Sequence, residues 1–479
     1  MVSRLRRIAL LRASSALAAA LAVTSCEEGT SPPVTCEPSE SDACIGVPEG
    51  ALCEDTFCTD GVSCAEIIEV GSTSELAGAL GDASSGACIA LGPGEYGAVE
   101  LPAGVSLLGR GAAFVKVESV RLGAGRGATL RGLTVTGGID AGSATETTID
   151  SVLVSGGQIG LKAGAGADVV VTRSEVRAAI EVGVLIEGAS SVTVSQSIVA
   201  QTAGPGMWSV CDPSLADACG CAVQPTVVLE HVVIQQPTYA AVHFAGTKAS
   251  MNDVTITDVL PSGTSIQKPG GGLSVTACST LDYRDVSIEK AGSYGMLVDH
   301  AAAAPSSGMA EHGIIIIDTK PGLWIKGTDD TTPVVLDSID IQACRGTGLG
   351  IDLDAKGIII IDTKIKGTQL ESVPVAVEPN QPPAVAQIGL GLAWRAGAAV
   401  QVNGIEVADN ATNGILIDGP VGAQSSLTNV VLGPGDDTEG VVQQQVMSPA
   451  DAPATMGVAL TQTAQKISDV PIGPEAPTP

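Results

Sequence analysis

Three residues of this chain form the combination best suited to catalytic chemistry: Asp299, His300 and, further along, Arg345. In the eliminative cleavage of a uronate polymer, an arginine takes the proton α to the carboxylate while a bound cation acidifies that proton. We therefore take Asp299, His300 and Arg345 as the candidate catalytic residues. Arg284 and Arg395 are isolated alternatives for the arginine.

Signatures of other enzyme classes are missing from the sequence. It contains no phosphate-binding loop, no dinucleotide-binding phrase after a strand and no G-x-S-x-G. The acid pairs Asp329-Asp330 and Asp436-Asp437 stand in phrases typical of turns. The histidines show no metal-ligand spacing, so the sequence predicts no metal centre built on them.

The net charge and the shortage of aromatic residues narrow the choice of ligands. The formal net charge is −28 at pH 7, which repels nucleic acid and anionic lipid. It suits solubility outside the cell, cation binding, or a neutral or cationic partner. Aromatic residues make up only 2% of the chain, which counts against a carbohydrate enzyme, because sugar-binding clefts usually contain stacking rings.

Residues 1–25 have the pattern of a secretory signal peptide, in which arginines precede an Ala/Leu-rich stretch. The stretch ends in Val-Thr-Ser-Cys, which resembles the bacterial lipobox. This resemblance implies cleavage before Cys26 and lipid attachment to its thiol, and an ordinary signal peptide is the alternative. Glu27 at the next position points to the outer membrane. We therefore expect a lipid-anchored protein of the cell envelope, with the membrane as a partner.

Twelve cysteines indicate an oxidising compartment. Residues 26–66 form a cysteine-rich linker with too few apolar residues for a core, so disulfides must stabilise it. Two long loops further along hold four more cysteines, for which we expect one disulfide within the first loop and consider a bridge from the second. The disulfide candidates are Cys36, Cys44, Cys53, Cys58, Cys64, Cys211, Cys219, Cys221 and Cys278.

Short words rich in Val and Ile recur at intervals of 22–23 residues, as in the serines Ser151, Ser174 and Ser197. Such words with Gly-marked corners predict a solenoid of about a dozen stacked β coils, since one coil cannot bury its apolar face alone. The word GIIIIDTK appears twice, at 313–320 and 357–364. We expect its copies at different phases of the coil, or a first copy that cuts across one corner.

A second recurring phrase indicates which side chains face outward. In GVLIEG, from Gly183, alternation turns Val184 and Ile186 inward and Leu185 and Glu187 outward. Across the coils the phrase predicts one fairly apolar and one mostly acidic outward stripe. The apolar stripe would contain Leu185, His243, Leu297, Trp324, Gly350, Ala376 and Leu416, and the acidic one Glu187, Ala245, Asp299, Lys326, Asp352, Glu378 and Asp418.

These stripes supply most of the candidate binding residues, Trp208, His243, Trp324 and Asp352. An apolar stripe beside stacked carboxylates could bind a glycan chain or Ca²⁺, since hard cations need several oxygens at one point. Alternatively, the acids only keep the solenoid soluble and the apolar stripe lies under loops. Trp208 stands in the first of the two long loops, where it could stack on a ligand or cover the core.

The N-terminal flank of the repeats carries a family resemblance. An amphipathic stretch at 74–82 is followed by IALGPGEY and GVSLLGRG. This order is similar to the opening of right-handed parallel β-helix proteins of the pectate-lyase-like superfamily, in which the helix caps the core. The resemblance implies an all-β right-handed parallel β-helix over 67–445. The composition of the remainder, 446–479, is mixed, so we expect a C-terminal cap and a disordered Pro-rich tail there. In pectate lyases outward aspartates hold calcium, and LVDH at 297–300 resembles their W-I-D-H phrase.

The sequence thus leads to two functional hypotheses. The first, which we favour at this point, is a surface-anchored, non-catalytic binding or structural module for extracellular polysaccharide or a surface protein. The second is a polysaccharide lyase or glycoside hydrolase that acts in a groove beside the long loops. The fold hosts both, so only the geometry of a site can separate them. Converging acids, or an acid with arginine or histidine in a cleft, would favour the enzyme.

Overall fold

The structure is a computed structural model, and all its described residues belong to one compact unit, residues 36–479. They are residues 45–53, 57–59, 61–211, 223–261, 271–306, 313–327, 333–352, 355–375, 384–395, 397–411, 413–418, 425–432, 439–444, 455–458 and 465–469. The helix of this part of the chain is α1 (Thr73–Asp82), and the described residues contain no helix long and apolar enough to span a bilayer.

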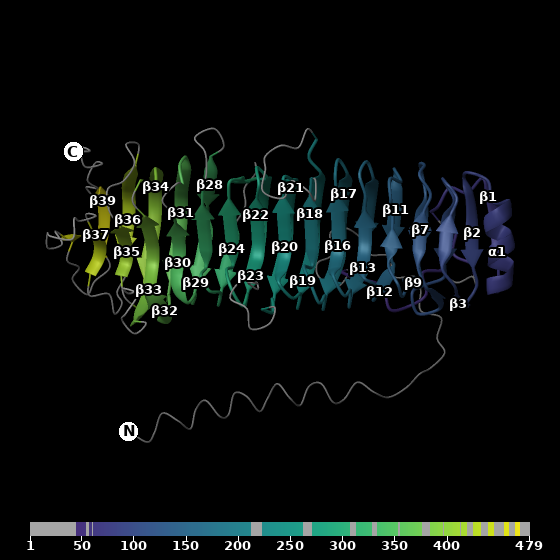
Figure 1. Cartoon of the computed structure of the whole chain (residues 1–479), viewed down its shortest axis with the longest axis horizontal. Coiled ribbons are helices and arrows are strands. Elements are labelled where there is room, and N and C mark those ends of the chain that lie inside the picture. The colour runs from purple at the N-terminus through teal and green to yellow at the C-terminus, as the bar shows by residue number, and fades with distance from the viewer. Residues whose placement is uncertain are drawn as a thin grey trace, which may run out of the picture. The chain divides into compact units, whose positions relative to one another are not determined.

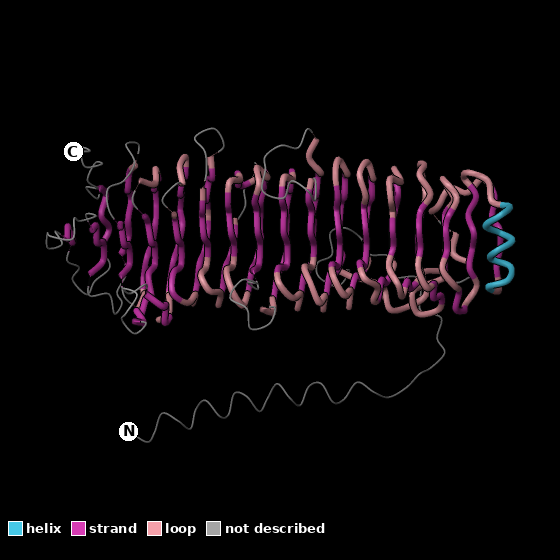
Figure 2. The backbone as a smooth tube through the Cα atoms, in the orientation of Figure 1, coloured by secondary structure: helices cyan, strands magenta, loops and turns pink. Residues whose placement is uncertain are grey.

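The strands stack coil upon coil into a parallel β-helix, which confirms the predicted fold class (Figures 1 and 2). Each complete coil has three straight stretches, which we name face 1, face 2 and sheet B in chain order. Faces 1 and 2 form one 23-stranded sheet, because several strands bend from one face into the other. Sheet B has sixteen strands, of which fourteen run parallel and give one strand per described coil.

Face 1 consists of β1 (Glu66–Val70), β2 (Ala87–Leu91), β5 (Ser106–Gly109), β8 (Thr129–Arg131), β11 (Thr147–Asp150), β14 (Asp168–Thr172), β17 (Ser191–Ala200), β19 (Thr226–Gln235), β21 (Lys248–Thr257), β23 (Thr280–Glu289), β25 (Ala302–Pro305), β28 (Val334–Asp337), β31 (Ile358–Lys366), β34 (Val400–Ala408) and β36 (Ser426–Leu432). Face 2 consists of β3 (Gly94–Tyr96), β6 (Val115–Val117), β9 (Thr134–Val135), β12 (Leu153–Ser155), β15 (Glu175–Arg177), β26 (Ile314–Ile317), β29 (Ile339–Gln342) and the second halves of the long face 1 strands.

The parallel strands of sheet B are β4 (Val99–Leu101), β7 (Val120–Leu122), β10 (Ile139–Asp140), β13 (Ile159–Ala163), β16 (Val182–Glu187), β18 (Met207–Val210), β20 (Ala240–Ala245), β22 (Gly271–Thr276), β24 (Met296–Asp299), β27 (Leu323–Lys326), β30 (Gly346–Ile351), β33 (Ala384–Arg395), β35 (Asn413–Asp418) and β37 (Glu439–Gln444). The antiparallel additions are β32 (Glu371–Val375) on β33, β38 (Thr455–Val458) on β37 and, on face 1, β39 (Gln465–Asp469) on β36.

Residues in the left-handed conformation make the two corners that flank face 2. At the first corner, His231 stacks on Asp253 with φ values of 54° and 53°, and their side chains pair at 2.6 Å between Nδ1 and Oδ2. Such residues tolerate this conformation at modest cost in a turn. The first-corner residues include Arg173, Gln196, His231, Asp253, Asp285, Ser338, Asp362 and Asn429, and the second-corner residues include Ala178, Gln201, Gln236, Asp258, Lys290, Asp318, Ala343 and Asp409.

The two GIIIIDTK copies lie at different phases of the coil, as the first of our two expectations states. In the first copy, Ile314–Ile317 forms β26 on face 2 and Asp318 turns the second corner. In the second copy the isoleucines open β31 on face 1, and Asp362 turns the first corner. One register assignment needs correction. The backbone amide of Val152, not of Ser151, donates a hydrogen bond to the Ser174 hydroxyl oxygen, so the coil between Val152 and Ser174 is 22 residues long.

One continuous apolar core runs through the coils from Val70 to Leu432. Val and Ile occupy the inward positions of the strands, as alternation predicts. The helix α1 covers the N-terminal end, where Leu76 and Ala79 join the core and the Ser72 hydroxyl accepts a hydrogen bond from the Glu75 amide. An uncovered first coil would expose this core to water.

The small residue of the recurring phrase forms a ladder of glycines where each coil enters sheet B. A Cβ atom on Gly295 would lie 2.6 Å from the carbonyl oxygen of Gly322 and would overlap the Ile316 side chain. Neighbouring coils are therefore too close for a side chain here. The glycine ladder comprises Gly183, Gly206, Gly272, Gly295, Gly322, Gly348, Gly391 and Gly414, with Ala241 in one coil.

The described part of the cysteine-rich linker, residues 45–53, 57–59 and 61–65, lies against the β-helix along the first corner, and we name it the strap. The Gly46 amide donates to the Gln196 carbonyl and the Leu52 amide to the Arg110 carbonyl, both at 2.8 Å. A disulfide joins Cys64 to Cys88 in β2, and Cys88 was not among our candidates. This segment is therefore packed on the body and does not act as a free spacer.

The remaining cysteine predictions fall partly inside the described residues. Cys53 is half-buried and Cys58 is buried within the strap. Cys211 and Cys278, from the two long loops, are each disulfide-bonded. The lipidation candidate Cys26 and the disulfide candidates Cys36, Cys44, Cys219 and Cys221 lie outside the described residues.

Candidate functional site

Outward side chains of sheet B form a row across successive coils, which we name the middle stripe. Strand pairing places Leu185 beside Trp208, and Trp208 beside His243. The stripe begins with charged residues, continues with aromatic and apolar ones, and ends with small or aliphatic ones. In stacking order it comprises Glu100, Arg121, Asp140, Lys162, Leu185, Trp208, His243, Ser274, Leu297, Trp324, Gly350, Ala393 and Leu416.

One predicted member of each stripe is wrong. Ala376 and Glu378 belong to a phrase that resembles the repeat but leaves the coil. Its strand β32 runs antiparallel to β33, and β33 supplies Ala393 to the stripe. Ala376 and Glu378 themselves lie outside the described residues. The phrase Gly-Leu-Ala-Trp-Arg, ending at Arg395, fits the repeat equally well and could have identified the right strand.

The second stripe is not mostly acidic. Strand pairing inserts Val210, Thr276 and Arg395 into it, so Asp299, Lys326, Asp352 and Arg395 alternate in charge. Arg395 Nη1 lies 3.3 Å from Asp352 Oδ1. Among the described residues, no three His, Cys, Asp or Glu side chains gather as they would around a metal ion.

A groove of about 440 Å³ opens on sheet B around Trp324. The Trp324 Nε1 donates a hydrogen bond to Asp352 Oδ2 at 2.9 Å, and the Arg395 guanidinium lies 5.9 Å from the indole centroid. Gly350 is the next residue of the middle stripe, and a Cβ atom there would overlap the indole ring. The glycine therefore lets the ring lie across the strand, while Asp352 and Arg395 hold it in place.

The rest of this groove combines apolar walls with charged pairs. Ile388 and Leu390 line it beside Lys320, which forms an ion pair with Glu371. Arg345 is 57% exposed and lies 3.8 Å from Asp318. Each cation of the groove thus has a carboxylate nearby. An aromatic platform beside such paired donors and acceptors can stack on a sugar ring and hydrogen-bond its hydroxyl or carboxylate groups.

Trp208 and His243 meet at the centre of the middle stripe. Their rings are edge to face, with centroids 5.8 Å apart and an interplanar angle of 88°. Trp208 also packs on the small apolar cluster Val210, Ala245 and Ala277, so it covers apolar surface as the alternative interpretation states. Its Nε1 is buried and has no hydrogen-bond partner within the described part of the chain. Both side chains are half-buried.

Burial lowers the pKa of His243 from its usual value of 6.5 to about 4. The imidazole is therefore neutral at pH 7. Between about pH 6.5 and pH 4 the unfolded chain takes up a proton here that the folded chain does not, so this residue makes the protein less stable as the pH falls through that window. We expect the His243 ring to titrate near pH 4 by NMR in the folded protein, whereas a midpoint near 6.5 would contradict its burial.

The three candidate catalytic residues do not converge. His300 Nδ1 lies 2.8 Å from Asp299 Oδ1, and Asp299 is the last residue of β24. Arg345 directly precedes β30. The pair and the arginine therefore stand at opposite ends of the sheet B strands, separated by several residues at about 3.3 Å each. Counting coils along the sequence placed them close together, but it did not distinguish the two ends of a strand.

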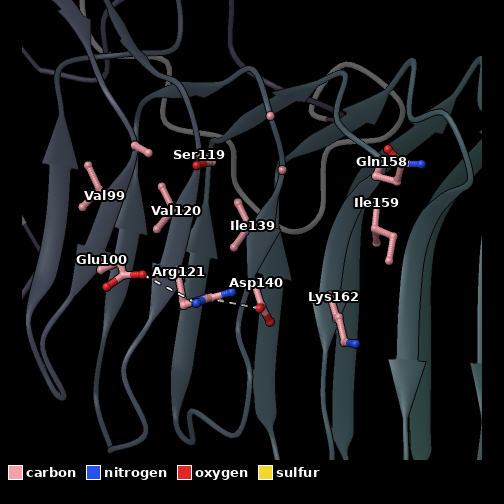
Figure 3. A pocket seen from close by; sticks show the side chains of 13 residues that line it. Val99, Glu100, Ser119, Val120, Arg121, Ile139, Asp140, Gln158, Ile159 and Lys162 are labelled. Atoms are coloured by element: carbon pink, nitrogen blue, oxygen red, sulfur yellow. Dashed lines mark ion pairs between the residues drawn. The ribbon is translucent and has the colours of Figure 1, made fainter.

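A second groove, of about 420 Å³, lies over the first coils of sheet B (Figure 3). Gly137 and Gly138 line it, together with Glu100, Arg121, Asp140 and Lys162 from four successive strands. Arg121 lies 3.5 Å from Glu100 and 3.6 Å from Asp140, as the dashed lines in Figure 3 indicate. We had not identified this charged segment from the sequence, because these coils lack the recurring phrase.

No family model matches this chain, and neither does any curated protein. One similar solved structure is the catalytic unit of a GH87 α-1,3-glucanase from Streptomyces thermodiastaticus, with a TM-score of 0.42 and 14% identity over 86% of this chain and 72% of that one. An alginate lyase from Paenibacillus has a TM-score of 0.29 and 12% identity, and the match covers 71% of this chain and 95% of that one. The A-module of a mannuronan C-5 epimerase from Azotobacter vinelandii has a TM-score of 0.34 and 14% identity, and the match covers 82% of this chain and 96% of that one. These names describe those three proteins, and similarities of this size carry no conclusion about the function of this chain.

Proposed function

We propose that this protein binds a polysaccharide chain along the outer face of sheet B, with the Trp324 groove as the main contact. The observation that carries the proposal is the indole of Trp324, which lies over Gly350 and is held by Asp352 and Arg395 in an open groove. The chain has only three tryptophans, and two of them belong to the middle stripe. Both outward tryptophans, Trp208 and Trp324, therefore lie along one row on which a sugar chain could stack.

The direction of the stripe favours a polymer over a single small ligand. From Leu185 to Trp324 the stripe crosses five coil steps. At about 4.8 Å per step this is roughly 24 Å. An extended chain lying across the strands would contact Trp208, Leu297 and Trp324 in turn. The net charge of −28 disfavours a polyanion such as nucleic acid over the surface as a whole, whereas Lys320, Arg345 and Arg395 supply local positive charge in the groove.

Cleavage of the bound chain is the second candidate function. Lys320, Arg345 and Glu371 line the same groove as Trp324. The candidate base, Arg345, and a group that can neutralise charge, Lys320, therefore stand beside the Trp324 ring. Glycoside hydrolysis normally needs two carboxyl groups across the bond. Glu371 is the one carboxylate that lines this groove in the described part of the chain. Elimination from a uronate polymer therefore suits the groove better than hydrolysis does.

Replacing Trp324 with alanine tests the binding site. We expect affinity for the recognised polysaccharide to fall about tenfold or more, since loss of one stacked ring and its buried area costs roughly 1.4 kcal/mol or more. Affinity electrophoresis against neutral and uronate polysaccharides would find the ligand and measure the change. Phe114→Ala is the matched control, because Phe114 is an exposed ring outside sheet B. Equal losses in both variants would contradict the proposed site.

The same panel, with and without Ca²⁺, distinguishes binding from cleavage. Unsaturated products read by ultraviolet absorbance would establish a lyase, and new reducing ends without them a hydrolase. Any activity in this groove should be lost in Arg345→Ala and kept in His300→Ala, because His300 does not line the groove. Activity lost only in His300→Ala would place the chemistry elsewhere.

A further inference from the structure

The first four residues of the middle stripe form a ladder of alternating charge. Glu100, Arg121, Asp140 and Lys162 stand on the adjacent strands β4, β7, β10 and β13, and their side chains point out of the sheet (Figure 3). Their exposed fractions are 81%, 66%, 40% and 36% in this order. We name these residues the charge ladder. Its sequence of charges is negative, positive, negative, positive.

Small residues flank the charge ladder on both sides. Along each strand, the residues two positions away from the charged one are small, so no long side chain of the same strand covers the four charged groups. Another protein surface could therefore approach the charge ladder closely. The flanking residues are Ala98, Pro102, Ser119, Gly123, Gly138, Gly142, Gly160 and Gly164.

This order of charges is complementary to itself when reversed. We propose that the charge ladder docks against the same ladder of a second copy of this chain, with a two-fold axis that runs parallel to the strands between Arg121 and Asp140. Glu100 of one copy then faces Lys162 of the other, and Arg121 faces Asp140. Both ladders have the same spacing of about 4.8 Å per coil, so all four positions match together.

Charge complementarity favours a second copy over other occupants. A partner of uniform charge would meet a like charge at two of the four positions, and like charges placed together disfavour an interface. The pairs already present within the chain, Arg121 with Glu100 and with Asp140, are exposed and therefore worth little. Lys162 also contacts Glu187, at 2.9 Å, and can reach a new partner only by sharing that contact.

The dimer should be weak and dependent on concentration. Two chains that each carry a net charge of −28 repel one another at long range. At an ionic strength of about 0.15 M the Debye length is about 8 Å, so this repulsion is reduced while close contacts between ladders persist. The charge ladder and its flanking residues offer a smaller area than the roughly 1,200 Å² or more of accessible surface that stable interfaces bury.

Two double variants test the proposal by sedimentation velocity at 0.15 M salt over a range of protein concentrations. Every sample carries Cys26→Ser, so that no acyl chain can associate the copies. Glu100→Arg/Arg121→Glu keeps the composition and net charge but places like charges at all four contacts. Glu100→Lys/Lys162→Glu also keeps the net charge, and it restores opposite charges at all four contacts. Circular dichroism and thermal midpoints would verify that both variants fold.

We expect the first variant to raise the dissociation constant of the dimer about tenfold or more, and the second to stay within about threefold of the wild type. The proposal is overturned if the wild type stays monomeric, if the first variant associates like the wild type, or if the second dissociates as readily as the first. It is also overturned if the first variant loses polysaccharide binding while its association is unchanged, because the ladder would then belong to the glycan site.

Discussion

Replacing Gly295 with alanine is expected to lower the free energy of unfolding by about 3 kcal/mol, because overpacking a dense core costs about 1–3 kcal/mol and sometimes more. The added Cβ would overlap Ile316 and approach the Gly322 carbonyl oxygen to 2.6 Å. That oxygen belongs to the next coil and accepts a hydrogen bond from the Met296 amide, so it cannot move without weakening the stack. Urea unfolding followed by circular dichroism would measure the loss.

Gly97→Ala is the matched control for Gly295→Ala. A Cβ atom on Gly97 would have no neighbour within 4 Å, and its backbone is not left-handed. We expect this variant to unfold within about 0.5 kcal/mol of the wild type, as surface substitutions usually do. An equally small change in Gly295→Ala would mean that adjacent coils can separate slightly at the glycine ladder, as they do for Ala241 in its own coil.

The same glycine ladder explains why the fold could be predicted from the sequence. Only a small residue fits at the glycine ladder, where neighbouring coils meet. The recurring phrase therefore indicates which segments stack, without any information about contacts between distant residues. Alternation then turned Val184 and Ile186 inward and Leu185 and Glu187 outward, which the structure confirms. Period and pattern are local properties, and a solenoid is built from contacts between nearest repeats.

The candidate site was harder to predict, because it depends on which segments leave the coil. Trp324 and Asp352 follow the phrase and were placed correctly. Arg395 was missed as their neighbour because the phrase around Ala376 offered a false coil, while the true strand, β33, comes after the antiparallel β32. The hydrophobic pattern cannot distinguish a strand that stacks on the next coil from one that folds back antiparallel, since apolar and polar residues alternate in the same way in both.

The two GIIIIDTK copies show the same limit at a smaller scale. Four isoleucines suit a strand on either face, where two of them point inward, and aspartate suits either corner because it tolerates the left-handed conformation. Asp318 and Asp362 adopt nearly equal φ values of 52° and 43° at different corners. The word therefore specifies a strand followed by a corner, and the stacking partner decides which strand and which corner.

Cysteine pairing was the least predictable feature, because a disulfide depends on distance in space and not on pattern. Cys64 was a candidate through its place in the cysteine-rich linker, whereas Cys88 sits alone in β2 and carries no such signal. The pairing became evident only from the course of the strap. The strap crosses several coils along the first corner, and its last described contact before β1 is the Ala65 amide on the Gly86 carbonyl.

Removing this bond with Cys64→Ser is expected to lower the free energy of unfolding by about 3 kcal/mol, because the bond closes a loop with a sequence separation of 24. Serine at this partly exposed position leaves the core unchanged, whereas replacing Cys88 would also remove a fully buried side chain. A mutation is better suited than a reductant, since Cys211 and Cys278 are disulfide-bonded as well.

The strap should loosen in Cys64→Ser before the coils unfold. Hydrogen exchange at the Leu52 amide, which donates to Arg110, would become faster, while amides inside β20 and β22 would keep their protection. Cys344→Ala provides the comparison of a buried cysteine in the core, for which we expect a loss of stability without faster exchange in the strap. Unchanged exchange at Leu52 would show that backbone contacts alone hold the strap, and the disulfide would then act only on the unfolded chain.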